Sequence, residues 1–106
     1  MNTPSTLYIL MYDITHDKTL QKVARYLEQV GYERINYSVW YGLLHPYKNV
    51  EIRTKLKTLL KNPAAKGSRI YFMPLNVKNF SKMRHYNGKK LEQMDYWTGK
   101  TKTMFF

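Results

Sequence analysis

Apolar residues recur in short blocks along the chain, and the spacing within each block predicts its secondary structure. Residues 7–12 (LYILMY) are almost wholly apolar, which is typical of a strand covered on both faces. Residues 33–44 (ERINYSVWYGLL) are rich in β-branched and aromatic side chains and favour two strands. Between these blocks, apolar residues recur at helical spacing at Leu20, Val23, Ala24, Leu27 and Val30.

Capping residues and helix breakers indicate where the two predicted helices begin and end. Thr15 is placed to cap the first helix and Asp17 to complement its dipole, while Gly31 ends it. Pro46 is expected at or just before the start of the second helix, where its missing N–H costs little. Asn62 and Pro63 end this second helix. Its apolar stripe consists of Val50, Leu56, Leu59 and Leu60.

Residues 68–75 (SRIYFMPL) predict a last buried strand, with Pro74 at its exit or near an edge. The order strand, helix, strand, strand, helix, strand is the ferredoxin-like βαββαβ arrangement of an α+β fold. Two helices then cover one face of an antiparallel sheet. We expect one core domain over residues 1–88, followed by a basic, aromatic tail over residues 89–106 that serves in dimerisation or partner docking.

The charge balance points to a polyanionic partner. Lys and Arg number 18 against 7 for Asp and Glu, so the formal net charge is +11 in 106 residues. Such an excess favours nucleic acid, either duplex DNA or RNA. No apolar run approaches the roughly 20 residues that span a bilayer, and the chain has no cysteine. We therefore expect a cytoplasmic protein that does not engage a membrane.

Asp13 is the strongest candidate for chemistry. It follows the first apolar strand and precedes a helix, so its side chain should emerge where a strand ends, a common place for ligands. The alternative is that Asp13 caps the helix, and the residues alone weight the two interpretations about equally. Asp17 is interpreted as a stabiliser of the helix dipole and His16 as a solvated side chain.

Other familiar sites lack support in the sequence. The three histidines are scattered and no cysteine completes a zinc site. Phosphate-binding, dinucleotide-binding and serine-elbow motifs are also missing. One carboxylate is a poor Mg²⁺ site, but a two-fold axis could bring Asp13 against its symmetry mate. A divalent cation, Mg²⁺ or another such as Mn²⁺, would relieve the repulsion and could activate water for phosphodiester hydrolysis.

Several blocks, taken together and in order, resemble the CRISPR-associated protein two family, the small non-integrase subunit of the spacer-acquisition pair. The resemblance covers about residues 7–88. Its blocks are residues 7–15 (LYILMYDIT), 22–31 (KVARYLEQVG), 34–42 (RINYSVWYG), 69–75 and 79–83. Individually each block is a weak signal, but their order makes the set specific.

The resemblance implies a role in CRISPR adaptation. It implies a ferredoxin-like homodimer, in which the C-terminal part of one chain packs on the sheet of the other, with an integrase subunit as partner. The family's divalent-metal site uses one aspartate from each subunit, which is Asp13 here. Family members are described as metal-dependent endonucleases on single-stranded RNA or duplex DNA, and also as non-catalytic bridges that hold DNA between integrase dimers.

Further roles follow from the resemblance by position. Tyr12 would flank the catalytic Asp13, while Lys22 and Arg34 would contact phosphates. Ser38 and Trp40 belong to the family's block of serine, valine and an aromatic residue, which is Ser-Val-Trp at residues 38–40 here. By this resemblance they are candidates for nucleic-acid binding.

Two features of the sequence bear on these nucleic-acid contacts. Leu20 departs from the family pattern, which often has a basic residue there. Phosphate is then either bound less strongly at that point or contacted by Lys18 and Lys22 instead. For Trp40 and Tyr41, packing within the sheet is favoured over base stacking, because strand aromatics usually pack.

Three functions remain open at this point. The first is a metal-dependent endonuclease and the second is a non-catalytic DNA-binding scaffold between integrase dimers. The third is an unrelated RNA-binding module of the same fold, which would need a basic and aromatic octamer on a central strand. The sequence contains no such octamer.

Overall fold

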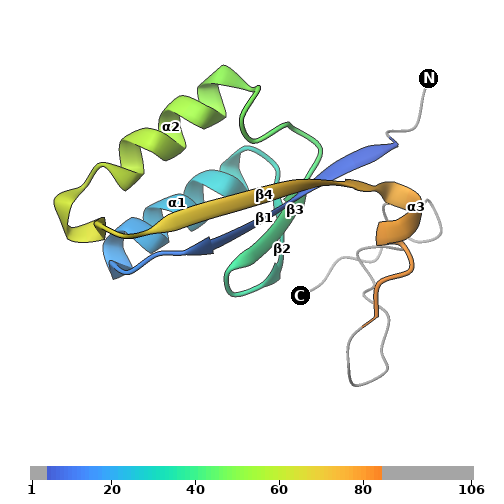
Figure 1. The fold of residues 1–106 in the computed structure, drawn as a ribbon, viewed down its shortest axis with the longest axis horizontal. Helices are drawn as coiled ribbons and strands as arrows, with labels where there is room; N and C mark the ends of the chain where they lie inside the picture. The colour runs from blue at the N-terminus through green and yellow to red at the C-terminus, as the bar shows by residue number, and fades with distance from the viewer. Residues whose placement is uncertain (1–4, 85–106) are drawn as a thin grey trace.

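The structure is a computed structural model that describes residues 5–84, and the fold is given for these residues. Its four strands form one antiparallel sheet in the order β2-β3-β1-β4, and two long helices lie on the same side of it (Figure 1). This α+β, ferredoxin-like order confirms the predicted fold class. The elements are β1 Thr6–Asp13, α1 Asp17–Gln29, β2 Glu33–Asn36, β3 Val39–Gly42, α2 Val50–Leu60, the 3-10 turn η1 Pro63–Ala65, β4 Arg69–Asn76 and α3 Val77–Phe80. The predicted tail over residues 89–106 lies outside the described residues.

The start of α1 differs from the prediction. His16, with an extended backbone, is the N-cap residue, and its ring Nδ1 lies 2.9 Å from the Thr19 hydroxyl. The prediction that Thr15 caps this helix was therefore wrong. The backbone N–H of Thr15 instead donates to Ser68 Oγ at 3.0 Å, in the segment before β4. The end of the helix is as predicted, since Gly31 follows it with φ of 98°, a conformation that suits glycine.

The start of α2 also lies further along the chain than Pro46 suggested. Pro46 is buried in a preceding turn, and Asn49 caps the helix by accepting a hydrogen bond from the Ile52 N–H at 3.1 Å. A helix with this start turns Ile52 and Leu56 into the core and leaves Val50 61% exposed, so the predicted apolar stripe was wrong at Val50. The predicted end is confirmed.

Alternate residues of β1 face two separate apolar clusters. Leu10 and Tyr12 face the helices and pack with residues of α1 and α2. Leu7 and Ile9 face the other side of the sheet, where the short helix α3 covers them with Phe80. This helix was not predicted, because it is too short for the helical spacing of apolar residues to show.

The strand β4 is an edge strand and not the buried strand that its apolar sequence predicted. Among residues 5–84 it pairs with β1 alone, in a register that places Arg69 opposite Asp13. Its central side chains Tyr71, Phe72 and Met73 are 51%, 39% and 48% exposed. Pro74 is compatible with this place, because an edge strand has one side without ladder hydrogen bonds.

Candidate functional site

Asp13 ends β1 with its side chain exposed on the sheet face opposite the two long helices. It does not cap α1, because His16 occupies that position. Among residues 5–84 the carboxylate of Asp13 has no hydrogen bond or ion pair. Arg69 is its neighbour across the strand pair, so the two side chains leave the sheet from adjacent positions on the same face.

Tyr12 is adjacent in sequence but lies on the other face. It is 6% exposed, its hydroxyl accepts from Trp40 Nε1 at 3.2 Å, and the same hydroxyl donates to the Tyr37 carbonyl at 3.3 Å. Consecutive strand residues point to opposite faces, so the structure does not bring the Tyr12 side chain to Asp13. The expectation that Tyr12 flanks the carboxylate site therefore fails on geometry.

Arg34 and Trp40 are brought together on the β2–β3 hairpin. The guanidinium carbon of Arg34 lies 4.5 Å from the centroid of the Trp40 ring, within the range of a cation–π contact. Trp40 is 3% exposed, so its ring packs in the core and is not free for base stacking. Ser38 lies in the hairpin turn, where its carbonyl accepts from the Tyr12 N–H at 3.1 Å.

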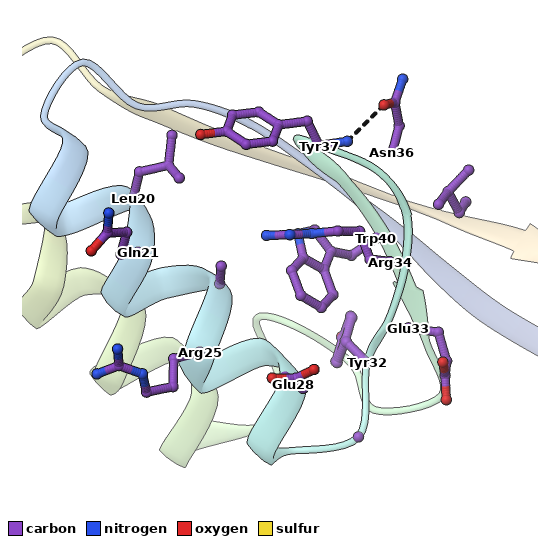
Figure 2. Close-up of a pocket in the computed structure, with 13 residues that line it drawn as sticks. Leu20, Gln21, Arg25, Glu28, Tyr32, Glu33, Arg34, Asn36, Tyr37 and Trp40 are labelled. Atoms are coloured by element: carbon purple, nitrogen blue, oxygen red, sulfur yellow. Dashed lines mark hydrogen bonds between the residues drawn. The ribbon is translucent and has the colours of Figure 1, made fainter. Parts of the chain in front are cut away.

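A groove of about 1080 Å³ separates α1 from this hairpin (Figure 2). Arg34 and Trp40 line it from the hairpin, and Arg25 and Glu28 from α1. The Arg34 Nε is buried without a hydrogen-bond partner, so it retains a donor that a bound anion could satisfy. The nearby acid Glu28 makes the groove mixed in charge.

Lys22 occupies a different hollow. It is exposed on α1 and lines a smaller hollow of about 230 Å³ between α1 and α2, together with Arg25 and Lys55. Lys18 lies one helical turn before it and is also exposed. The predicted phosphate contacts Lys22 and Arg34 thus belong to separate hollows on either side of α1.

The described chain holds one half of a metal site at most. Among residues 5–84, no three histidine, cysteine, aspartate or glutamate side chains come together. The exposed carboxylate of Asp13 has the oxygen donors that Mg²⁺ prefers, and one or two carboxylates with waters suffice for this ion. The residues therefore fit a divalent cation when a second Asp13 or a phosphate completes the site.

Comparison with known proteins assigns the family. The model of the family described as CRISPR associated protein Cas2 matches residues 6–83. The chain belongs to this family. A chain in the solved structure "Partial Cas6-RT-Cas1--Cas2 complex" is 26% identical, with 81% of this chain and 96% of that chain covered and a TM-score of 0.65. No curated protein matches. Membership of the Cas2 family supports a role in CRISPR adaptation.

Sequence reasoning missed Arg69 and an aromatic cluster around Tyr47 and Phe72. Arg69 stands beside Asp13 only through the register of β1 and β4, which nothing in the local sequence discloses. The rings of Tyr47 and Phe72 meet although they are far apart in the chain.

In the described part of this Cas2-family chain, no helix has the length and apolar character needed to cross a membrane.

Proposed function

We propose that this Cas2-family chain acts in CRISPR adaptation as a homodimeric nucleic-acid-binding subunit, with an integrase subunit as partner. The family match over residues 6–83, which includes Asp13, carries the proposal. The net charge of +11 supports a nucleic-acid partner. The similar chain of known structure comes from a complex that contains Cas1, which supports an integrase partner.

The open face of the sheet supports self-association. Met11, Tyr71 and Met73 are 37%, 51% and 48% exposed, and the strand register places Met11 directly opposite Tyr71. Neighbouring exposed apolar side chains of this kind mark interaction surfaces. Because a two-fold interface uses the same patch on both chains, this face would bring each Asp13 toward its counterpart.

The chemistry that fits this arrangement is metal-dependent phosphodiester hydrolysis. Two Asp13 carboxylates, one from each chain, would hold Mg²⁺ or Mn²⁺, and such an ion polarises a phosphodiester and lowers the pKa of a bound water. Arg69 beside each Asp13 would bind a phosphate oxygen and offset the charge that develops during hydrolysis. Single-stranded RNA and duplex DNA are the candidate substrates.

A non-catalytic scaffold is the second candidate. The observation that favours it is the spread of exposed cations over both helices, including Lys22, Arg25 and Lys55, which lie away from Asp13. Such side chains hold a DNA backbone without reading its sequence. In this function the dimer bridges integrase subunits on duplex DNA.

Substitution of Asp13 separates these candidates. Purified full-length protein is incubated with duplex DNA and single-stranded RNA, with Mg²⁺ or with EDTA. We expect cleavage in Mg²⁺ only, and its loss in Asp13→Asn. Asp17→Asn is the matched control, because Asp17 is also exposed but lies in the first turn of α1, and it should cleave normally.

Two outcomes contradict the nuclease. Cleavage that persists in Asp13→Asn would exclude the paired carboxylates as its metal site. If wild-type protein binds DNA in a salt-sensitive manner and cleaves neither substrate, the scaffold is the function.

A further inference from the structure

Four rings from three segments of the chain meet on the helix side of the sheet, beside its β4 edge. Tyr8 comes from β1, His45 and Tyr47 from the loop before α2, and Phe72 from β4. The ring centroids of Tyr8 and His45 are 4.7 Å apart, and those of His45 and Phe72 are 5.5 Å apart. These contacts join the loop to the edge of the sheet.

Tyr47 and Phe72 form the outer pair of this cluster. Their ring planes are inclined by only 12°, with 6.4 Å between the centroids. Tyr47 is 47% exposed and Phe72 is 39% exposed, so both residues reach the surface. Two nearly parallel, exposed aromatic rings offer flat apolar surfaces on which another planar group can stack.

Hydrogen bonds hold the loop that carries Tyr47. The ring Nδ1 of His45 accepts from the Tyr47 N–H at 3.1 Å and from the Lys48 N–H at 3.0 Å. Arg53 Nη1 donates to the Tyr47 carbonyl at 3.1 Å, and the Tyr32 hydroxyl donates to the Leu44 carbonyl. A loop whose backbone is held in this way loses little conformational entropy when a ligand binds.

Cations surround the ring of Tyr47. The guanidinium carbon of Arg53 lies 4.9 Å from its centroid, and the ammonium nitrogen of Lys57 lies 5.4 Å from it. Over residues 47–66 the single acidic residue is Glu51. The cations of this segment are Lys48, Arg53, Lys55, Lys57, Lys61 and Lys66. The rings therefore lie beside a strongly positive segment, which suits a polyanion.

We propose that Tyr47 and Phe72 form a stacking site for single-stranded nucleic acid, with Arg53 and Lys57 contacting its phosphates. Aromatic platforms within a basic surface are the usual means of binding single strands without sequence preference. A duplex fits less well, because its bases are stacked on one another and expose only their edges.

This site is separate from the face that carries Asp13. Phe72 opposes Leu10 in the register and points to the helix side, whereas Tyr71 and Asp13 point to the other side. One chain would then contact an unpaired strand on the helix side while its open face serves the dimer. The site needs neither the metal nor the second subunit.

The test uses the full-length protein and the fluorescence anisotropy of labelled oligonucleotides. The probes are a thymidine strand, an abasic strand of the same length and a duplex. We expect Tyr47→Leu and Phe72→Leu each to weaken binding of the thymidine strand roughly tenfold. Neither variant should change binding of the abasic strand or the duplex, and Tyr47→Phe should retain binding.

Matched controls separate stacking from general charge and folding effects. Tyr37→Leu removes a tyrosine that is 65% exposed on the β2–β3 hairpin, and it should leave binding unchanged. Lys57→Gln and Lys55→Gln each remove one charge from α2, but the Lys55 ammonium lies over Tyr26, 5.9 Å from that ring centroid. Lys57→Gln should therefore weaken binding of the thymidine strand more than Lys55→Gln does.

Several outcomes would overturn the stacking site. One is that wild-type protein binds the abasic strand as tightly as the thymidine strand. Another is that Tyr37→Leu weakens binding as much as Tyr47→Leu. If Tyr47→Leu and Phe72→Leu impair capture of the Cas1 integrase and leave all oligonucleotides unaffected, the surface docks a protein instead. Binding is measured in EDTA, where no metal can contribute at Asp13, so the result of this test is independent of the test of the nuclease.

Discussion

The two faces of the sheet are built from alternate residues of the same strands but have different surroundings. On the helix side, Leu10, Tyr12 and Trp40 are each at most 6% exposed and pack with α1 and α2. On the other side, Met11 and Tyr71 remain 37% and 51% exposed. Because burial of apolar side chains stabilises a fold, we expect the helix side to supply most of the stability of the chain, whereas the other side keeps apolar side chains exposed.

The open face is itself covered unevenly. The short helix α3 places Phe80 against Tyr41, with ring centroids 4.7 Å apart, and together with Leu7 and Ile9 they form a small second core. The opposite end of β1, with Met11 and Asp13, has no such cover among residues 5–84. Asp13 therefore belongs to the part of the sheet that has the most room for a second chain or a ligand.

The largest effect should come from breaking the helix-side core. Trp40→Ala removes a ring that packs with α1 and α2 and whose Nε1 donates to the Tyr12 hydroxyl. It also removes the nearer of the two rings that lie against the Arg34 guanidinium, the other being Tyr37. We expect the free energy of unfolding to fall by about 3–5 kcal/mol. Chemical denaturation followed by circular dichroism measures this loss. Tyr71→Ala on the open face serves as the comparison.

Tyr71→Ala should lower the unfolding free energy by much less when both proteins are diluted below the range in which they associate. If both variants lost the same unfolding free energy at that dilution, the helix side would not be the main source of stability. A larger loss for Tyr71→Ala that appears only at high concentration would instead reflect association through the open face.

The next effect concerns association alone. Tyr71→Asp places a charge in the centre of the open apolar patch, and burial of that charge in a dimer would cost about 2 kcal/mol or more. We expect sedimentation velocity to show a dimer for wild-type protein and a monomer for Tyr71→Asp, with an unchanged circular dichroism spectrum. Tyr37→Asp, on the exposed hairpin turn, should remain dimeric.

A wild-type monomer at micromolar concentration, or a dimer that survives Tyr71→Asp, would exclude the open face as the dimer interface. In that case two Asp13 carboxylates could not meet across it, and the proposed metal site would lose its basis.

Local signals made the first half of the fold predictable. The apolar block of β1 and the helical spacing of α1 are strong, and Gly31 with its positive φ marks the helix end. The burial of β4 could not be predicted, since its apolar sequence is that of a covered strand and only the strand order makes it an edge. The start of α2 was misplaced because Pro46 and Asn49 are both plausible start signals, and Asn49 holds the cap.

The candidate site was predictable only in part. The place of Asp13 at the end of a strand follows from the sequence and is confirmed. The side chain of Tyr12 was assigned to the same site, although the two-residue period of a strand turns it to the opposite face. Arg69 beside Asp13, and Tyr47 beside Phe72, depend on register and on the path of a loop, which the local sequence does not encode.

The smallest effect tests a single hydrogen bond at the end of the helix-side core. Tyr32 is 3% exposed, and its hydroxyl donates to the Leu44 carbonyl in the loop that leads to Tyr47. Tyr32→Phe keeps the ring, which packs closely over Gly42, and removes only the hydroxyl. We expect a loss of about 1 kcal/mol in the unfolding free energy at neutral pH. Tyr37→Phe, an exposed control, should show none.

Burial, and secondarily the charge of Tyr8, raises the pKa of Tyr32 well above its ordinary value of 10.0. The unfolded chain therefore loses this proton first as the pH rises, so the hydroxyl stabilises the folded state below pH 10 and progressively less above it. Urea denaturation measures the free energy of unfolding of wild type and of Tyr32→Phe at neutral pH and above pH 10. We expect the difference between the two free energies to become smaller as the pH rises. Lysine titration affects both proteins alike and cancels in that difference. A difference that stays constant or grows with pH would show that the Tyr32 hydroxyl ionises no less readily in the fold than in the unfolded chain.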